Sequence, residues 1–533
     1  MNRLPVTALS ERSWDLLVVG GGATGLGVAV QAALEGYRVL LVEARDFASG
    51  TSSRSTKLLH GGVRYLAQGR VGLVREALRE RAVVMRIAPH LAQPLPFVVA
   101  ERRRWALPGT AIGLKLYQWL AGGLSLGATE WVSGIAPDGH SQGQGSGVRY
   151  WDGQFEDARL ALALARTAQA AGAQLRNHTE VKALAPTGDG WSVELTDALD
   201  GSRATVQAHC VVNATGVWVD GLRTAALSGR PAPLVQPSQG VHLVVARETL
   251  PLNEAVLVPH TDDGRVLFAV PWLGATVIGT TDTPRPDAPR EPRPMPEELD
   301  FLFQQTRQSL GIDLQPEDVR SVWVGLRPLV SAGGGSGGKG GATSQISREH
   351  TILREAPGFL TVTGGKWTTY RSMADEVMQS LRSGHDLGPA PLAGVDTATH
   401  PLHGAPSGAQ PQRSLREAPG AHLFGTEQAA LQALPGAGRE LGLGLTEAMV
   451  RFCARHEWAI TVEDMLARRW RALFLDARRA EAMAPLVADL LREETGIDPQ
   501  LPAFLALCQR YRLDAATLTS LQPQASANME TAL

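Results

Sequence analysis

The chain has 533 residues, of which 44% are hydrophobic and 20% charged, enough for about two to four domains with a large core. A formal net charge of −2 gives no overall basic field and argues against nucleic acid as a partner. The three cysteines, Cys210, Cys453 and Cys508, form no CxxC motif or disulfide framework, so we expect buried or inert thiols in a reducing compartment.

We expect no targeting or membrane-spanning segment. Residues 1–14 lack the apolar stretch of a secretory signal, and no apolar run reaches the roughly 20 residues that cross a bilayer. The sequence therefore predicts a cytoplasmic protein, or one bound peripherally to a membrane.

The first predicted unit is a strand, a glycine turn and a helix. The apolar run 16–19 reads as a buried strand, and residues 24–35 read as a helix whose N-terminal N–H groups face a pyrophosphate. Between them, Gly20 lets the chain turn, Gly22 lets the backbone approach phosphate, and Gly25 lets the helix pack on the strand. This pattern predicts a dinucleotide site.

A second strand supports this interpretation. It spans 38–42 and ends at Glu43, 23 residues after Gly20, where a carboxylate accepts hydrogen bonds from ribose hydroxyls. An acidic residue at this place disfavours a 2′-phosphate. The unit by itself is compatible with NAD, with FAD or with an empty loop.

Three segments follow. The hydroxyls of a Ser/Thr-rich loop over 49–56 suit phosphate and ribityl contacts. Helical spacing over 71–87 predicts a scaffold helix. Residues 101–120 join the basic start 102–104 to an apolar body with two tryptophans, which fits either an interfacial membrane helix or a buried helix with a solvated start.

The middle of the chain returns to β-structure. We expect a helix over 157–171, strands over 174–182 and 191–196, and a β-branched strand that ends at 214–216. That last strand rejoins the dinucleotide sheet, which makes the cofactor domain discontinuous. Short β-rich segments over 234–281 predict a mixed sheet in a second domain.

A glycine-rich run precedes a third glycine-ended strand. Residues 333–341 contain seven glycines and mimic a phosphate loop, but Gly340 replaces the required Ser or Thr and no helical pattern follows, which argues against an NTPase. The strand 359–363 then runs into 364–366 and a helix from Thr368, so that another helix N-terminus points at a ligand.

The C-terminal part is predicted to be helical. Residues 384–412 read as a linker, and 415–520 show a nearly continuous helical pattern. Pro485 is expected as the first residue of a helix that runs to Glu493. We assign no chemistry to this part, including the arginine-rich run 467–471.

Three glycine-ended strands around one ligand exceed the needs of a nicotinamide site and favour FAD, with its ring buried between two domains. Five blocks, in order along the chain, then resemble the FAD-dependent glycerol-3-phosphate dehydrogenases of the aerobic, respiratory type, in the D-amino-acid-oxidase-like group of flavoproteins. The blocks lie at 51–66, 212–218, 278–282, 325–328 and 364–371. The resemblance covers residues 14–382, and the helical tail more loosely.

The predicted fold class is α/β, with a discontinuous Rossmann-like FAD-binding domain, a mixed-sheet α+β substrate-binding or cap domain and a C-terminal all-helical domain. The expected boundaries are 14–95, 145–233 and 355–383 for the FAD-binding domain, 96–144 and 234–354 for the cap, 384–412 for the linker and 413–522 for the helical domain.

The resemblance implies oxidation of sn-glycerol 3-phosphate to dihydroxyacetone phosphate, with hydride passing from C2 to the flavin and electrons then to membrane quinone. This reaction needs cations for the phosphate, a proton acceptor and a dry flavin face. The candidate substrate-binding residues in the matching blocks or beside them are Arg64, Tyr65, Arg327, Arg348 and Lys366.

The candidate catalytic residues are His60, His242 and Arg327. Imidazole titrates nearest to working pH, so either histidine suits a base, although a lone histidine is more often structural. Arg327 suits stabilisation of a developing alkoxide, and Lys366 suits a place near the flavin N1–C2 carbonyl.

The resemblance also implies the cofactor contacts, and we expect no metal site. The expected FAD-binding residues are Gly20, Gly22, Ala23, Thr24, Gly25, Glu43, Ala44, Thr51, Ser52, Ser53, Lys57, Leu58, His60, Gly61, Gly62, Val181, Ala214, Thr215, Gly216, Gly365, Lys366 and Thr368. The chain departs from the family pattern at Trp367, where an aliphatic residue is expected, and in the glycine run 333–341.

Three other functions stay open. They are a glycerol-3-phosphate oxidase that makes hydrogen peroxide, an amine or amino-acid oxidase of the same flavoprotein group, and a flavin-binding protein without turnover. The expected partners are sn-glycerol 3-phosphate, membrane quinone, a peripheral contact on the cytoplasmic face of the inner membrane and a second copy of the chain in a homodimer.

Overall fold

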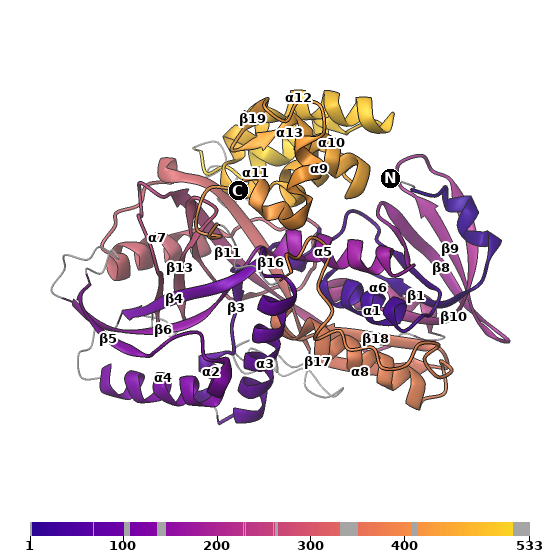
Figure 1. The fold of residues 1–533 in the computed structure, drawn as a ribbon, viewed down its shortest axis with the longest axis horizontal. Coiled ribbons are helices and arrows are strands. Elements are labelled where there is room, and N and C mark those ends of the chain that lie inside the picture. The colour runs from indigo at the N-terminus through magenta and orange to yellow at the C-terminus, as the bar shows by residue number, and fades with distance from the viewer. Residues whose placement is uncertain are drawn as a thin grey trace, which may run out of the picture.

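The computed structural model shows two large sheets side by side, with a helical domain placed across them (Figure 1). It describes residues 3–67, 69–100, 107–135, 145–227, 229, 231–259, 261, 265–330, 350–407 and 413–514. The predicted contributions of 102–104, 333–341 and Arg348 lie outside these described residues.

The first sheet contains the predicted dinucleotide unit. Its main path runs in the order β17 (His350–Ala356), β18 (Phe359–Gly364), β10 (Arg203–Asn213), β1 (Trp14–Val19), β2 (Val39–Val42) and β7 (Gln174–Arg176). The strands β18, β10, β1, β2 and β7 are parallel, and β10 continues into an antiparallel extension formed by β9 (Gly190–Asp197) and β8 (Thr179–Thr187).

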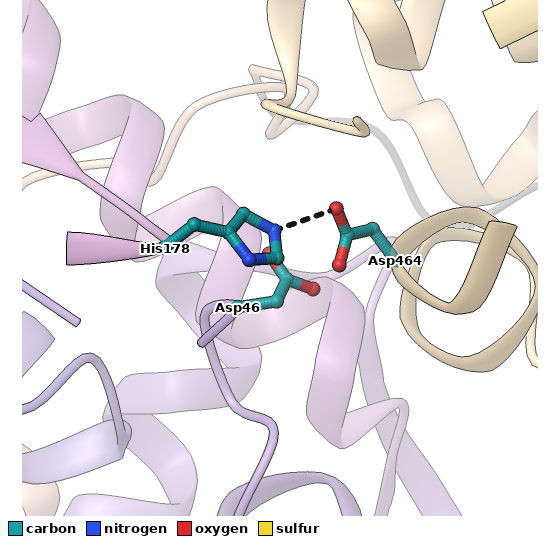
Figure 2. Close-up of side chains that lie close together, drawn as sticks. All are labelled: Asp46, His178 and Asp464. Atoms are coloured by element: carbon teal, nitrogen blue, oxygen red, sulfur yellow. Dashed lines mark hydrogen bonds and ion pairs between the residues drawn. The ribbon is translucent and has the colours of Figure 1, made fainter. Parts of the chain in front are cut away.

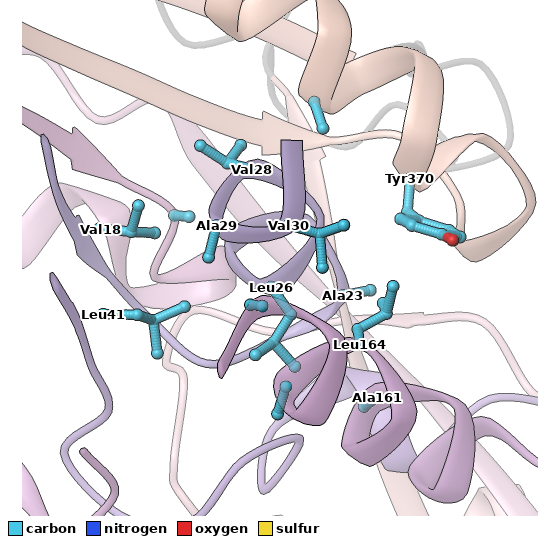
Figure 3. Packing of buried hydrophobic residues seen from close by; sticks show 14 of the residues in the cluster. Val18, Ala23, Leu26, Val28, Ala29, Val30, Leu41, Ala161, Leu164 and Tyr370 are labelled. Carbon is cyan, nitrogen blue, oxygen red and sulfur yellow. The ribbon is translucent and has the colours of Figure 1, made fainter. Parts of the chain in front are cut away.

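Three helices, α1 (Ala23–Leu34), α5 (Asp157–Ala170) and α8 (Tyr370–Ser383), form the main core of this part of the molecule. Figure 3 shows side chains of α1 packed on two sides. On one side lie Val18 and Leu41 of the strands, and on the other lie Ala161 and Leu164 of α5. The helix approaches α8 closely, since a Cβ at Gly27 would lie 2.9 Å from the ring of Tyr370. The short α6 (Val219–Ala226) follows β10.

The second sheet is mixed, as the sequence predicts for the cap. Its order is β15 (Thr283–Pro284), β11 (Val235–Ala246), β14 (Ala275–Gly279), β13 (Leu267–Trp272), β12 (Ala255–Val258), β4 (Ala92–Ala100), β6 (Gly145–Phe155) and β3 (Leu58–Leu59). In addition, β16 (Val319–Val330) pairs with β11, and β5 (Glu130–Ile135) pairs with β6. The helices of this part are α2 (Val63–Ala67), α3 (Val71–Ile87), α4 (Leu107–Ala121) and α7 (Pro296–Leu310).

The C-terminal part is helical apart from a two-stranded hairpin, β19 (Glu440–Gly442) and β20 (Leu445–Thr446). Its elements are α9 (Gln428–Gln432), α10 (Glu447–His456), a π-helical segment (Asp464–Arg469), α11 (Ala472–Leu475), α12 (Ala477–Thr495) and α13 (Leu501–Arg510). The predicted helix start at Pro485 is wrong, because Pro485 lies inside α12. That helix begins after Asp476, whose side chain accepts a hydrogen bond from the N–H of Arg479 as an N-cap.

Most other predicted elements are confirmed, with small shifts. The helix over 71–87 is α3. The strand predicted over 174–182 is instead two strands, because His178 takes a left-handed conformation with φ of 50° between β7 and β8. All three cysteines are free and buried, as expected. Among the helices in the described ranges, none has the length and apolar character needed to span a bilayer.

Candidate active site

The predicted cofactor residues gather at one edge of the first sheet. The parallel strands β1, β2, β10 and β18 are followed by Gly20, Glu43, Ala214 and Gly365, respectively. The carboxyl ends of parallel strands share one edge of a sheet, which is where ligands bind in open α/β folds. The fold therefore unites the N-terminal unit with two distant segments of the chain, at 214 and 365.

The glycine turn leaves no room for side chains. A Cβ at Gly25 would overlap the carbonyl oxygen of Gly20, and a Cβ at Gly20 would lie 2.5 Å from the carbonyl oxygen of Ala214. The N-terminus of α1 has no side-chain cap from Gly22, but the N–H of Ala23 donates to Ser52 Oγ at 2.9 Å. The turn thus brings backbone donors and a hydroxyl together where a pyrophosphate is expected.

Glu43 lies beside this turn, at the end of β2. Its Oε2 accepts from the N–H of Gly21 at 2.7 Å, and its Oε1 accepts from the N–H of Arg45 at 3.0 Å. Burial raises the pKa of Glu43, while these two backbone hydrogen bonds oppose the rise. The carboxylate is therefore fixed beside the glycine turn, where the sequence predicts a ribose.

The residues present fit FAD. A Cβ at Gly216, which follows β10 with φ of 64°, would meet no atom within 4 Å, and one at Gly22 would meet only Ser52 Oγ. Open space therefore adjoins both glycines. Its surroundings combine a helix N-terminus for phosphate with the Glu43 carboxylate for ribose hydroxyls, which is the donor and acceptor set that the ADP half of FAD requires.

A loop over 51–57 connects this edge to the second sheet. Thr51 Oγ1 donates to the carbonyl oxygen of Leu326 in β16 at 2.6 Å, and Trp367 Nε1 donates to the carbonyl oxygen of Ser52 at 2.8 Å. The unexpected tryptophan at 367 thus supports the loop from the end of β18. Both sheets hold this loop, and it lies between them.

Lys57 ends this loop with its ammonium fully buried. The Nζ donates to the carbonyl oxygen of Ser53 at 2.9 Å and to Asp157 Oδ2 at 2.7 Å, and it lies over the rings of Trp272 and Trp323. Burial lowers the pKa of Lys57 to about 7, although the charge of Asp157 opposes this shift. The ammonium of Lys57, a residue predicted to bind the cofactor, is thus paired with the carboxylate of Asp157.

His242 lies on β11, behind the loop. Its Nε2 is 3.0 Å from Thr56 Oγ1, and its ring stacks on Trp323 with centroids 4.0 Å apart. The residue is only 2% exposed. Burial first, and the charges of Arg327 and Lys57 second, hold its pKa well below the usual value. His242 is therefore a neutral, enclosed imidazole, which suits support of Thr56 better than contact with a substrate.

Arg327 lies on β16 at the edge of the same region. Its guanidinium donates to Thr280 Oγ1 at 3.0 Å, to the carbonyl oxygen of Thr281 at 3.1 Å and to Asp282 Oδ1 at 3.3 Å. Its side chain keeps a quarter of its surface exposed. These contacts fix the position of a cation that is still accessible from solvent.

Lys366 lies next to the His60 loop, which is the segment 60–62 between β3 and α2. Its Nζ is 4.0 Å from the centroid of the Tyr65 ring, and a Cβ at Gly62 would lie 3.1 Å from that Nζ. The N–H of Gly61 donates to Tyr117 Oη at 2.8 Å. Lys366, Tyr65 and the segment that follows His60 therefore form one polar cluster.

The remaining predicted site residues lie in the following elements. Arg64 belongs to α2. Of the remaining FAD-binding candidates, Thr24 is in the first turn of α1, Ala44 follows Glu43, Leu58 is in β3, Val181 is in β8, Thr215 follows β10, and Thr368 is buried after β18.

Three important residues carry no site prediction. They are Tyr117, Asp157 and Arg471, which contact the loops from α4, α5 and the C-terminal domain. Tyr117 has a signal in the sequence, because it continues the buried helical spacing of Leu107, Ala111 and Leu114.

One buried group has the composition of a metal site. Asp46, His178 and Asp464 offer ligand atoms within 4.8 Å of one another (Figure 2). However, Asp46 accepts hydrogen bonds from Arg468 and Arg469, and Asp464 accepts from His178 and Arg468. Protein cations already neutralise both carboxylates, so we interpret the group as an ion-pair network.

The chain is similar to known flavoprotein families over most of its length. Residues 15–371 match a model described as FAD dependent oxidoreductase, and residues 396–501 match one described as the C-terminal domain of alpha-glycerophosphate oxidase. The chain is 36% identical to the mitochondrial glycerol-3-phosphate dehydrogenases of Homo sapiens and Arabidopsis thaliana, with 92% of this chain and 72% and 84% of those proteins covered.

A solved structure supports the same relationship. The glycerol-3-phosphate dehydrogenase from Bacillus halodurans complexed with FAD superimposes with a TM-score of 0.73 and 28% identity, covering 96% of this chain and 97% of that chain. The L-alpha-glycerophosphate oxidase from Mycoplasma pneumoniae, at 18% identity and a TM-score of 0.54 over 69% of this chain and 95% of that chain, shares the fold.

Proposed function

Because the chain belongs to the FAD-dependent glycerol-3-phosphate dehydrogenase family, we propose that it oxidises sn-glycerol 3-phosphate to dihydroxyacetone phosphate. The observation that carries this proposal is the cluster of Lys366 and Tyr65 beside the His60 loop, on the sheet edge that fits FAD. When bound, FAD supplies the acceptor for the hydride that leaves C2 of the substrate.

The substrate phosphate is assigned to the cations at this edge. Arg327 follows Leu326, to which Thr51 is bonded, and Lys366 precedes Trp367, which bonds to the neighbouring Ser52. The two cations thus flank one short loop from the two sheets. A guanidinium and an ammonium in this arrangement suit a dianionic phosphate, and Arg64 and Arg348 are assigned to the same cradle from their motifs.

His60 is assigned as the base. It lies in the segment that leads to Gly61 and Gly62 next to Lys366, whereas His242 is enclosed by Trp323 and Thr56. As C2–H leaves with its electron pair, the imidazole takes the proton of the C2 hydroxyl, and the C–O bond becomes a carbonyl. His242 then supports the loop through Thr56.

The reaction is tested by anaerobic reduction of the bound flavin. We expect sn-glycerol 3-phosphate to bleach the flavin absorbance, and glycine or sarcosine to leave it unchanged. Reoxidation is then compared between a soluble quinone analogue and oxygen, with quinone expected to be much faster. Fast release of hydrogen peroxide with no effect of quinone refutes the dehydrogenase proposal, and bleaching by the amines alone refutes the substrate.

A quinone acceptor requires access to a membrane, and we propose that α4 provides it. Ile112 and Trp119 are 71% and 69% exposed, and Leu116 between them is 44% exposed. Their spacing of four and three residues places them on one face of the helix, while Leu114 and Tyr117 face the core. Helix α4 lies at the periphery of the molecule in Figure 1, and its exposed apolar residues suit the interfacial region of a bilayer.

Liposome flotation tests this contact. The double variant Ile112→Ser, Trp119→Ser is expected to lose most of its binding, and replacement of Arg102, Arg103 and Arg104 by Glu is expected to weaken binding to anionic lipid. The matched control is Leu392→Ser, which removes a leucine that is 57% exposed outside α4. Equal flotation of all variants refutes the contact.

The proposal also covers the face of the membrane to which the protein binds and its oligomeric state. We place the protein on the cytoplasmic face of the inner membrane, as a homodimer. Fractionation with protease protection tests the face, and sedimentation equilibrium in mild detergent tests the dimer.

A further inference from the structure

We infer that the arginines of residues 467–471, in the C-terminal domain, position the two loops that bind FAD and thereby retain the cofactor. The first cofactor loop is residues 43–49, after β2, and the second cofactor loop is residues 51–57. The inference rests on the FAD site, and it is independent of the identity of the substrate. It assigns a role to a domain in which the sequence patterns indicate no chemistry.

The first loop is held through Asp46, which is completely buried. Its carboxylate accepts hydrogen bonds from Arg468 and Arg469, and Asn177 Nδ2 donates to its Oδ1 at 3.1 Å. The same loop contacts the phosphate turn directly, because the N–H of Ala48 donates to the carbonyl oxygen of Gly21 at 2.9 Å. The arginine contacts therefore fix the loop that orients Glu43 and supports the glycine turn.

The second loop is held through Arg471, which is also completely buried. Its guanidinium donates to the carbonyl oxygen of Ser53 at 2.6 Å and lies 3.0 Å from Glu156 Oε1 and 3.6 Å from Asp157 Oδ1. Asp157 in turn accepts from Ser55 and Lys57, at 2.7 Å from each side chain. One residue of the C-terminal domain thus contacts the middle of the loop directly and its C-terminal end through Asp157.

This support extends to the phosphate turn through Ser52. Its hydroxyl accepts from the N–H of Ala23 at the start of α1, and its carbonyl accepts from Trp367. Ser52 directly precedes Ser53, the residue that Arg471 binds. Displacement of Arg471 therefore moves the hydroxyl that lies against the expected pyrophosphate.

The arginines and the loops also depend on one another electrostatically. Figure 2 shows His178 and Asp464 meeting beside Asp46, at the junction between the first sheet and the C-terminal domain. Burial lowers the pKa of His178, but the charge and hydrogen bond of Asp464 outweigh burial, and the net pKa is raised. Buried arginines are stable only with their carboxylate partners, which lie partly on the cofactor domain. The loops and the 467–471 run therefore order together.

The test measures release of FAD from the purified holoenzyme after dilution, followed by the rise in flavin fluorescence. Arg471→Lys and Arg469→Lys keep the charge but lose the fork of donors. We expect each to release FAD at least about tenfold faster, the effect of losing one charge-assisted hydrogen bond. The measurement needs no substrate, so a failure of this inference is distinct from a failure of the proposed reaction.

Arg451→Lys is the matched control. Arg451 is a largely buried arginine of the same domain, paired with Glu447, Glu493 and Glu494 of that domain. Its replacement is expected to lower the thermal midpoint of unfolding without changing the release rate of FAD.

Two outcomes decide between a positioning role and a purely structural one. Faster release of FAD from Arg471→Lys or Arg469→Lys than from Arg451→Lys supports the inference. Release at the control rate overturns it, even if the variants unfold at lower temperature. Should Arg471→Lys yield no folded holoenzyme, the Arg469→Lys variant decides the question.

Discussion

The hydroxyl of Tyr117 connects α4 to the His60 loop, and its removal is the sharpest test of how that loop is held. Tyr117 Oη accepts from the N–H of Gly61 at 2.8 Å and donates to Asp152 Oδ2 at 2.8 Å. Arg81 NH1 binds the other oxygen of Asp152 at 2.8 Å. Burial, and then Asp152, raise the pKa of Tyr117 far above its usual value, so the hydroxyl keeps its proton.

The Tyr117→Phe change removes both hydrogen bonds and leaves two buried partners. Gly61 keeps an N–H without an acceptor, which costs about 1–3 kcal/mol, and Asp152 loses a donor to a charged oxygen, which costs about 1.5–3 kcal/mol. Because Arg81 still pairs with Asp152, we expect the free energy of unfolding to fall by roughly 3–5 kcal/mol. The ring volume is unchanged, so packing contributes little.

The assay is urea unfolding of the holoenzyme together with steady-state kinetics. Loosening of the His60 loop is expected to lower kcat/KM for sn-glycerol 3-phosphate by about tenfold or more. A double-mutant cycle with Asp152→Asn is expected to show strong coupling, because the two side chains share one hydrogen bond. The control is Tyr150→Phe on the neighbouring ring, which touches Tyr117 edge-on.

Two results contradict this reasoning. A loss below about 1 kcal/mol for Tyr117→Phe means that water or a rearranged partner satisfies the N–H of Gly61. Additive effects of the Tyr117 and Asp152 variants mean that the hydrogen bond between them contributes nothing.

Three more predictions follow from the site and its titratable groups. Arg327→Lys is expected to raise KM for sn-glycerol 3-phosphate by about tenfold with normal FAD content, and Lys366→Met is expected to raise KM by about the same factor; an unchanged KM refutes their role. Gly25→Ala is expected to abolish FAD retention, because its methyl overlaps the Gly20 carbonyl, and a variant with normal flavin content contradicts the geometry. Burial lowers the pKa of His90 to about 3 and holds that of His242 well below its usual range. Since the unfolded chain binds these protons first, the contribution of these two histidines to the free energy of unfolding is constant above about pH 6.5. Below that pH it falls by up to about 1.4 kcal/mol per pH unit for each histidine. Urea midpoints at pH 7 and 5 measure this loss, and His90→Gln should reduce it; an unchanged slope refutes the assignment.

Local patterns in the sequence predict the cofactor domain well. Gly25 must be glycine because a Cβ there would overlap the carbonyl oxygen of Gly20, and Glu43 follows from the length of one helix and one strand. The helix over 71–87 follows from its spacing alone. Such features are decided within about 30 residues of chain, which is the range that periodicity and turn chemistry describe.

The divided strand and the enclosure of His242 depend on contacts between distant parts of the chain, whereas the misplaced helix start overlooks a local cap. His178 divides a predicted strand because its N–H binds the carbonyl oxygen of Arg45 and its ring binds Asp464. Pro485 reads as a helix start, but the cap at Asp476 begins the helix two turns earlier. For His242, residue type suggests a base, while the structure encloses it between Trp323 and Thr56, a packing that no local pattern reveals.

The run 467–471 contains a sequence signal for buried ion pairs. Its three arginines stand between the apolar residues Met465 and Leu466 and the apolar helix α11, all of them buried. Charges in such a setting must meet carboxylates, and the partners Asp46 and Glu156-Asp157 lie more than 300 residues earlier. The sequence thus predicts that these arginines have carboxylate partners, but it does not show which carboxylates they are. Only the fold brings the C-terminal domain against the loops near the start of the chain. Since the proposed FAD site includes those loops, we expect the C-terminal domain to act with the active site as one physical unit.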